Sequence, residues 1–167
     1  MTEKIVPLTI DKIEQCIELY NNVFNSEPWN EPWTYESAKE RLTDLINTPK
    51  FLGFLLYEND DLIGFIAGNS KKTYAGLTFY LAELCISNQI QGKGYGSKLL
   101  RYLEDELLKR EVRSLYLLTA NGGQAESFYL KNNYVINDNR IVIKKDLWSK
   151  RDLLKNDLFL MRTISNN

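Results

Sequence analysis

The sequence predicts an α/β fold, in which a central mixed β-sheet carries helices on both faces. Apolar runs of strand length alternate with segments whose apolar residues recur at helical spacing. A short polar tip joins two of these runs, as in an antiparallel hairpin. With 167 residues, 44% of them hydrophobic, the chain can bury one sizeable core. We therefore expect a single domain over residues 1–167.

A short strand and two helices are expected first. The strand covers residues 4–10, and Asp11 then caps a helix whose apolar residues share one face: Ile13, Cys16, Ile17, Tyr20 and Phe24. Thr34 is a suitable N-cap for a second helix, which should run to about Asn47 because Pro49 follows. The segment between the two helices is rich in Pro and Trp.

Three strands and a long helix are expected next. Residues 51–57 and 62–67 are apolar runs around a polar tip, which suits a hairpin. Residues 77–87 predict a longer strand. A helix over residues 96–110 should bury one leucine-rich face, made of Leu99, Leu100, Leu103 and Leu107.

The last third predicts a strand over residues 112–119 and a short helix over 124–131 that places Phe128 inward. Asn133 is suited to end this helix, because Asn tolerates the left-handed conformation. Two closing strands are expected at residues 140–145 and 157–164, on either side of a polar insertion at 148–155. This order of elements indicates a mixed sheet with helices on both faces.

Composition excludes several kinds of chemistry. Histidine is absent, which removes Ser-His-Asp and Cys-His catalysis and most transition-metal sites. The two cysteines, Cys16 and Cys85, form no C-x-x-C pair, so we expect neither a metal site nor a disulfide framework. Catalysis must therefore use Glu, Asp, Tyr, Lys, Ser or the backbone.

Charge and hydropathy set expectations for partners and location. The chain has 21 Lys and Arg against 22 Asp and Glu, a net charge of −1, and the basic residues are scattered. This argues against a nucleic-acid partner. No run approaches the ~20 apolar residues of a membrane span, and the start of the chain lacks an apolar leader region. We expect a cytoplasmic protein with no membrane partner, and a homodimer is compatible with the sequence.

A glycine-rich turn at residues 91–96 joins the long strand to the leucine-rich helix. Its alternate glycines allow close approach of a ligand, and the helix N-terminus favours an anion such as pyrophosphate. Ser97 occupies the third glycine position of a dinucleotide fingerprint, and no Walker A spacing exists. A tight turn without a ligand is the alternative.

The run Gln91-x-x-Gly94-x-Gly96 resembles the Q/R-x-x-G-x-G/A signature of the GNAT superfamily of N-acetyltransferases. Residues 125–134, AESFYLKNNY, resemble its A-x-x-F-Y-x-x-x-G-F segment, and the order of strands and helices also matches. Two positions depart from the pattern: Asn133 replaces the usual glycine, and the Asn often found before this segment is shifted to Asn121.

The resemblance implies transfer of an acetyl group from acetyl-CoA to a primary amine by direct attack, without a metal. The implied cofactor site comprises the turn and the following helix start, with side chains or amides of Gln91, Gly92, Lys93, Gly94, Tyr95, Gly96 and Ser97. It also includes the backbone of Leu84, Cys85 and Ile86, and Asn121 beside the pantetheine arm. Lys93 as a solvated surface lysine is the alternative for that residue.

Two catalytic residues follow from the resemblance. Tyr129 matches the usual general acid, which protonates the leaving thiolate. Glu83, a carboxylate within an apolar strand, is the candidate base, because partial burial raises its pKa toward neutral pH. The alternative is that Glu83 faces solvent or pairs with a cation of a neighbouring strand. Tyr80 and the acidic residues of the segment from Asn25 to Glu36 are substitute bases.

The Pro/Trp-rich loop, residues 25–33, is the expected acceptor site. Its aromatic rings and carboxylates suit a small cationic amine, such as a polyamine, an aminoglycoside-like molecule or a lysine-type group. The candidate contacts are Glu27, Trp29, Glu31 and Trp33, with Tyr80. Tryptophans that only cap the core are the alternative. An idle acyl-CoA sensor, a protein or peptide N-acetyltransferase and a nucleotide-binding protein of another fold remain as other functions.

Overall fold

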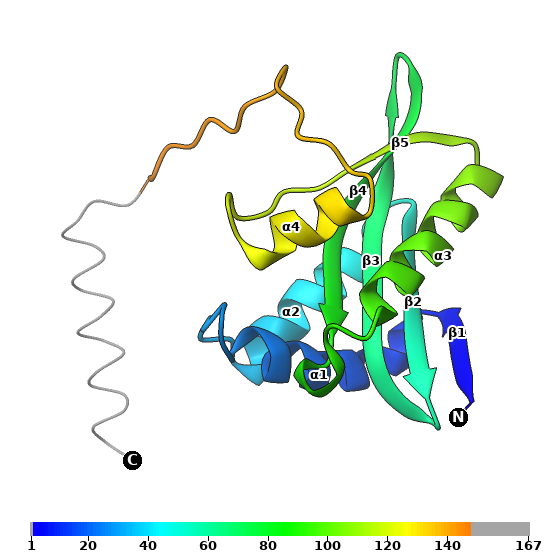
Figure 1. The fold of residues 1–167 in the computed structure, drawn as a ribbon, viewed down its shortest axis with the longest axis vertical. Coiled ribbons are helices and arrows are strands. Elements are labelled where there is room, and N and C mark those ends of the chain that lie inside the picture. The colour runs from blue at the N-terminus through cyan, green and yellow to red at the C-terminus, as the bar shows by residue number, and fades with distance from the viewer. Residues whose placement is uncertain (1, 148–167) are drawn as a thin grey trace. The chain divides into compact units, whose positions relative to one another are not determined.

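The computed structural model describes residues 2–147 and divides them into two compact units, one ending at Phe128 and one beginning at Tyr129. Figure 1 shows the elements. They are β1 (Glu3–Pro7), α1 (Ile13–Phe24), α2 (Tyr35–Ile46), β2 (Phe51–Glu58), β3 (Asp61–Thr73), β4 (Gly76–Ile86), α3 (Tyr95–Lys109), β5 (Val112–Tyr116) and α4 (Gln124–Lys131). Short 3-10 turns at Ile10–Lys12 and Asn88–Ile90 precede α1 and α3.

The sheet is mixed, as the sequence predicts. Its five strands lie in the order β1-β2-β3-β4-β5; the first four pair antiparallel, and β4 pairs parallel with β5. The predicted hairpin joins β2 to β3. Its two loop residues, Asn59 and Asp60, have φ angles of 49° and 71°. Such a left-handed pair matches the twist of the flanking strands.

Helices cover both faces of the sheet (Figure 1). Side chains alternate between the faces along a strand, so Leu55 and Tyr57 of β2 join the core that α1 and α2 form. Phe54, which precedes Leu55 and so faces the other way, meets the ring of Tyr102 from α3 edge-on at 4.9 Å. The four predicted leucines of α3 are buried. The expected amphipathic pattern of α3 is therefore confirmed.

Helix α2 begins where its cap predicts. The Thr34 hydroxyl accepts from the Ser37 amide, and the Ser37 hydroxyl accepts from the Thr34 amide. This reciprocal pair satisfies two amides that the first turn leaves without partners. Such a cap contributes about 1 kcal/mol to helix stability. It also fixes where the preceding Pro/Trp-rich loop ends.

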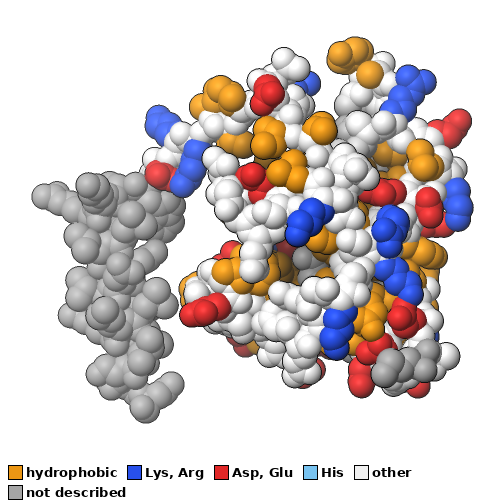
Figure 2. Space-filling view, in the orientation of Figure 1, with side chains coloured by type: hydrophobic (Ala, Val, Ile, Leu, Met, Phe, Trp, Pro, Cys, Tyr) orange, Lys and Arg blue, Asp and Glu red, His pale blue; other side chains and the backbone are white. Residues whose placement is uncertain are grey.

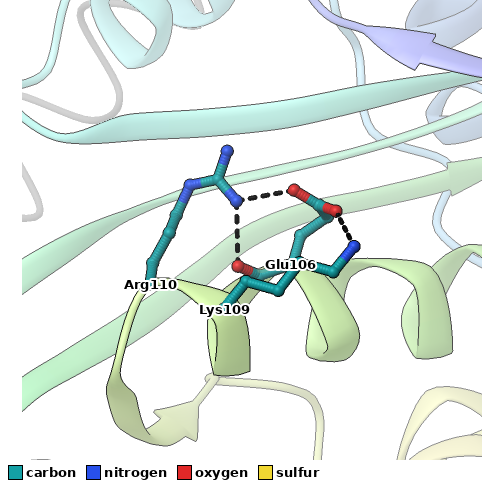
Figure 3. Close-up of polar contacts among 3 residues, drawn as sticks. All are labelled: Glu106, Lys109 and Arg110. Carbon is teal, nitrogen blue, oxygen red and sulfur yellow. Dashed lines mark hydrogen bonds and ion pairs between the residues drawn. The ribbon is translucent and has the colours of Figure 1, made fainter.

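Helix α3 ends in a small cluster of ion pairs, which Figure 3 shows. The Glu106 carboxylate pairs with Lys109 and Arg110, each at 2.6 Å, and Arg110 also donates to the Glu106 carbonyl at 2.9 Å. The hydrogen bond from Lys109, followed by that from Arg110, lowers the pKa of Glu106. The negative end of the helix dipole favours cations such as these. Glu111, with a φ of 57°, then turns the chain into β5.

Charges of both signs are distributed over the face that Figure 2 shows. Lys and Arg side chains are interspersed there with Asp and Glu among the described residues. None of the helices within residues 2–147 is long and apolar enough to cross a membrane. Within the same range, no group of three or more Cys, Asp and Glu side chains is arranged to hold a metal ion.

The last third departs most from expectation. Helix α4 has the predicted bounds and Asn133 the predicted left-handed conformation, with a φ of 68°. Strand β5, however, ends at Tyr116, and the predicted strand at residues 140–145 is wrong, because that segment forms no strand. Its apolar residues Ile141 to Ile143 are exposed. β-prone composition needs a pairing partner to become a strand. The predictions for 148–155 and 157–164 lie outside the described residues.

Candidate functional site

Strand β4 stops pairing with the neighbouring strand β5 about halfway along its length. Pairing between β4 and β5 ends at Tyr80 and Tyr116, and β4 then continues for six residues, 81–86. Along these residues one strand edge has no partner from β5. Exposed backbone amides and carbonyls of this kind can pair with an extended ligand as an added strand would. The predicted contacts Leu84, Cys85 and Ile86 lie on this edge.

A β-bulge marks the point of separation. Ala67 of β3 lies opposite Glu83, but the next residue, Gly68, lies opposite Leu81, so Ala82 is the extra residue. A bulge bends its strand and changes where the side chains point. A Cβ on Gly68 would lie 2.0 Å from the Tyr80 carbonyl oxygen, so only glycine fits beside the bulge. A glycine within a strand is a sequence signal for such a bulge, but it does not say which residue of the partner strand is the extra one.

The glycine-rich turn leaves amides available for an anion. Gly92 and Gly94 have φ angles of 81° and 88°, and the space where each Cβ would lie is open. Gly94 is the N-cap of α3, with no side-chain cap and no acidic residue in the first turn. The first-turn amides therefore have no protein acceptor from a cap, which suits a pyrophosphate. The turn and the open β4 edge together can hold an extended ligand that carries a pyrophosphate.

Several predicted cofactor residues serve the turn itself. The Gln91 amide donates to the Ile86 carbonyl at 3.0 Å and to Asn88 Oδ1 at 2.8 Å, so this side chain braces the turn. The Tyr95 phenol donates to Glu58 of β2. Cys85 is buried, and its Sγ lies 3.9 Å from the Leu19 carbonyl of α1. The side chains of Tyr95 and Cys85 are therefore engaged within the protein, and their backbone groups remain available to a ligand.

The side chains of the other predicted cofactor residues differ in their solvent exposure. Lys93 and Asn121 are exposed, whereas Leu84, Ile86 and Ser97 are half-buried. Gly96 lies under the Phe128 ring, which a Cβ at Gly96 would approach to 3.2 Å. Glycine at position 96 therefore serves close packing of α3 against Phe128.

Glu83 occupies a buried polar position on β4. Only 7% of its side chain is exposed, and Arg41 of α2 reaches its Oε1 with Nη2 at 2.8 Å and Nε at 2.9 Å. Arg41 is itself 46% exposed. Glu83 is thus buried, as the sequence predicts. The alternative, a solvent-facing Glu or one paired with a cation of a neighbouring strand, is wrong, because the cation comes from helix α2. The role of Glu83 as the base stays a prediction.

The environment of Glu83 acts on its pKa in both directions. Burial raises the pKa above its ordinary value, the charge of Arg41 and its hydrogen bond lower it, and the charge of Glu31 raises it again. A hydrogen bond from Tyr20 of α1 also favours the ionised form. For Tyr20 itself, burial and then the nearby Glu83 raise the pKa. Burial dominates for Glu83, and its pKa is raised.

The Pro/Trp-rich loop reaches this cluster through Glu31 and Trp33. Trp33 Nε1 donates to Glu31 Oε2 at 2.6 Å, and its ring meets Tyr20 edge-on at 5.2 Å. Trp29 instead packs against Phe24 at 5.3 Å and contacts the core, as does Trp33. Core packing, the alternative for these tryptophans, is therefore present for both. Glu27 is exposed.

Tyr80 lies where the strands separate. Its ring packs on Tyr116 at 5.1 Å, and Lys71 Nζ lies 5.5 Å from the ring centre. Burial lowers the pKa of Arg41, but the charge of Glu83 and its hydrogen bond outweigh this and raise it, with smaller contributions from Tyr20 and Tyr80. Within the first unit, the structure brings together five other residues from four segments: Tyr20 of α1, Glu31 and Trp33 of the Pro/Trp-rich loop, Arg41 of α2 and Glu83 of β4.

The sequence patterns assign no site role to Arg41 or Tyr20. The helical spacing predicts Tyr20 only as an apolar helix position, although its hydroxyl group is polar. Arg41 follows Ala38 by three residues and directly precedes Leu42, the two buried residues of α2. A cation at the border of a buried helix face is a usable signal, because it can reach a partner beneath the helix.

Tyr129 opens the second unit. Its ring contacts Tyr134 at 5.5 Å, and its carbonyl accepts from the amides of Asn132 and Tyr134 at 3.0 Å each. These contacts order the end of α4 around the left-handed Asn133. The role of Tyr129 as an acid stays a prediction.

Comparison with known proteins agrees with this geometry. The profile of the acetyltransferase (GNAT) family matches residues 13–134. A search of curated proteins finds no match. A possible acetyltransferase from Clostridium difficile 630 has a TM-score of 0.75 at 12% identity, covering 89% of this chain and 100% of that one.

Two further solved structures share the fold. An aminoglycoside acetyltransferase from an uncultured soil metagenomic sample, solved with sisomicin, has a TM-score of 0.69 at 18% identity, with coverage of 87% and 97%. An aminoglycoside N-acetyltransferase in complex with CoA has a TM-score of 0.70 at 10% identity, with coverage of 88% and 96%. The profile match covers more than half of the sequence, and the fold carries the open strand edge and uncapped helix expected of a CoA site. The chain therefore belongs to the GNAT acetyltransferase family and is an acetyl-CoA-dependent N-acetyltransferase.

Proposed function

We propose that the acceptor is the primary amine of a small cationic molecule, with Glu83 as the base and Tyr129 as the general acid. The observation that carries the proposal is the buried Glu83 carboxylate, which lies at the bulge where the β4 edge opens. Glu31 adds a second negative charge beside it. Against these two carboxylates stands one cation, Arg41, so the cluster keeps a net negative charge.

The reaction needs four contributions from the protein. The uncapped first turn of α3 and residues 92–97 hold the pyrophosphate, and the open β4 edge holds the extended arm. Acetyl-CoA supplies the acetyl thioester. Glu83 takes the proton that the acceptor ammonium must lose, and a β4 amide donates to the developing oxyanion. Tyr129 gives a proton to the departing sulfur.

The acceptor class follows from charge and ring chemistry. Negative charge beside aromatic faces attracts an ammonium through Coulomb and cation–π interactions. Trp33 and Tyr20 present such faces next to Glu31 and Glu83. Aminoglycosides are polycationic amines, and two of the structural relatives above are aminoglycoside acetyltransferases. We therefore place aminoglycoside-like and polyamine acceptors first in the set to test, followed by lysine-type amines.

A thiol-release assay with acetyl-CoA tests the proposal. The panel pairs cationic acceptors (kanamycin, spermidine and a lysine peptide) with a neutral monoamine and an acidic peptide that has a free N-terminus. We expect kcat/KM for the best cationic acceptor to exceed that for the neutral amine by about tenfold or more, equivalent to about 1.4 kcal/mol. The preference should shrink at high salt, because the loop charges are exposed.

Two results contradict the proposal. Faster transfer to the neutral or acidic acceptors would reject a cationic acceptor site. Binding of acetyl-CoA without thiol release for any acceptor would favour the sensing role.

Glu40→Gln serves as the matched control for the substitutions of Glu83 and Arg41 described below, because Glu40 is an exposed carboxylate next to Arg41 in the sequence.

A further inference from the structure

We propose that Arg41 is the positioning residue for the base: its guanidinium grips one oxygen of Glu83 and leaves the other oxygen to take the acceptor proton. The inference rests on the proposed role of Glu83 as base. It is carried by the geometry of the contact between α2 and β4. Arg41 does not act on the acceptor itself; it acts through Glu83.

The contact is one-sided. Both Arg41 donors, Nε and Nη2, reach the same oxygen, Oε1, at 2.9 and 2.8 Å. A guanidinium more often engages both oxygens of a carboxylate in a fork. Here the guanidinium is directed at Oε1 rather than shared between the two oxygens. The carboxylate is therefore held in one orientation, while its second oxygen keeps a lone pair for proton transfer.

Arg41 can hold Glu83 without neutralising its basicity. The guanidinium is 46% exposed, so solvent screens much of its charge, whereas Glu83 is only 7% exposed. Burial thus raises the pKa of Glu83, and Arg41 limits the rise. Without Arg41, the carboxyl group would stay protonated to a higher pH. The positioning residue thereby sets the lower end of the pH range in which the base is ionised.

The other charged and titratable groups around Glu83 are few. Tyr20 contributes from α1, Glu31 from the Pro/Trp-rich loop, and Cys85 from β4 itself. Burial raises the pKa of Cys85, and the nearby Glu83 raises it further. Burial and Glu83 do the same for the pKa of Tyr20. Both groups therefore stay neutral near pH 7, which leaves Arg41 as the cation that opposes the burial of Glu83.

The pH dependence of kcat/KM tests the inference. We expect Arg41→Met and Arg41→Gln to move the acid limb upward by about 1 to 3 pH units, the usual effect of an adjacent Arg on a carboxylate. Activity should recover on the high-pH side of the limb. Arg41→Lys should reverse part of this change, because it returns the charge without the two-donor grip. Glu40→Gln should leave the limb in place.

A purely structural ion pair gives a different pattern. It would lower kcat/KM by the same factor at every pH and leave the limb where it is, and that result overturns the inference. Truncation of Arg41 removes the cation beside the buried Glu83 carboxylate, so Arg41→Met can fold poorly. In that case Arg41→Gln decides the question, because it also removes the charge, and an unmoved limb in that variant counts equally against the proposal.

A readout that needs no acetyl transfer separates this inference from the proposed function. The carboxyl carbon of Glu83, assigned in the ¹³C NMR spectrum by its loss in Glu83→Gln, reports the protonation of that group directly. We expect its titration midpoint to rise in Arg41→Met; an unchanged midpoint rejects the inference. If the midpoint rises while Glu83→Gln keeps the full wild-type pH profile, Arg41 controls Glu83 but Glu83 is not the base, and only the proposed function fails.

Discussion

Trp33 donates its indole N–H to the Glu31 carboxylate at 2.6 Å, and the Trp33 ring packs against the core, so this bond ties an exposed carboxylate of the Pro/Trp-rich loop to a core-packed ring. The same indole packs edge-on against Tyr20, which lies beside Glu83. The orientation of an exposed carboxylate is thus fixed by a half-buried ring. Trp33 thereby links the charged Glu31, through Tyr20, to the candidate base Glu83.

We expect Trp33→Phe to raise KM for a cationic acceptor by roughly 2- to 5-fold, because an exposed charge contributes no more than about 1 kcal/mol. The kcat should change less, since Glu83 and Arg41 stay in place. Steady-state kinetics with a cationic and a neutral acceptor measure the effect. Equal increases in KM for both acceptors would show that Trp33 acts only through packing.

Glu83→Gln should lower kcat by about 10² or more, the usual contribution of a positioned base. Glutamine keeps the shape and accepts the Arg41 hydrogen bonds, but it takes no proton at neutral pH. Acetyl-CoA affinity should be unchanged, because the glycine-rich turn is separate from this cluster. Single-turnover kinetics and a binding titration distinguish the two. A kcat equal to that of Glu40→Gln would remove Glu83 from the mechanism.

The same variant should change the pH dependence of stability. The folded state raises the pKa of Glu83, mainly by burial, so folding favours the protonated form. The stability that protonated Glu83 contributes to the folded state is present below the ordinary Glu pKa of about 4.3. It is lost as pH rises through the pKa of Glu83 in the folded state. The loss is about 1.4 kcal/mol for each pH unit that separates the folded and unfolded pKa values. Denaturation from pH 4 to 8 should show Glu83→Gln gaining on the wild type as pH rises; a constant difference would contradict the raised pKa.

Tyr129→Phe should lower kcat by ~10² or more with little change in acetyl-CoA affinity, because the ring still packs while the proton donor is lost. Tyr134→Phe is the matched control, since it removes the hydroxyl of the ring that contacts Tyr129. Pre-steady-state release of CoA thiol is the measurement. A wild-type rate in Tyr129→Phe would assign the acid role to another group.

Gly94→Ala should weaken acetyl-CoA binding by roughly tenfold and destabilise the fold by about 1 to 2 kcal/mol. The cause is backbone strain, since Gly94 has a φ of 88° and a Cβ there meets no atom within 4 Å. The melting temperature should fall by roughly 2 to 8 °C. Gly123→Ala is the control, because its Cβ would make only ordinary contacts near 4 Å. Unchanged affinity in Gly94→Ala would separate the turn from the cofactor.

The sequence determined the local features of this protein. Thr34 and Ser37 supply a cap from two neighbouring side chains, the spacing of four leucines fixes the buried face of α3, and alternate glycines permit the left-handed turn. Each depends on residues within a few positions of one another. Local rules of propensity and spacing are therefore sufficient to find them, and the family motif at 91–96 belongs to this class.

The remaining features depend on contacts between distant segments. The bulge at Ala82, the end of β4–β5 pairing at Tyr80, and the reach of Arg41 to Glu83 across 42 positions all depend on segments far apart in the chain. The segment 140–145 shows the same limit from the other side, since its β-prone residues form no strand. Pairing register, burial and ion-pair partners are properties of two surfaces in contact, and one segment of sequence specifies only its own surface.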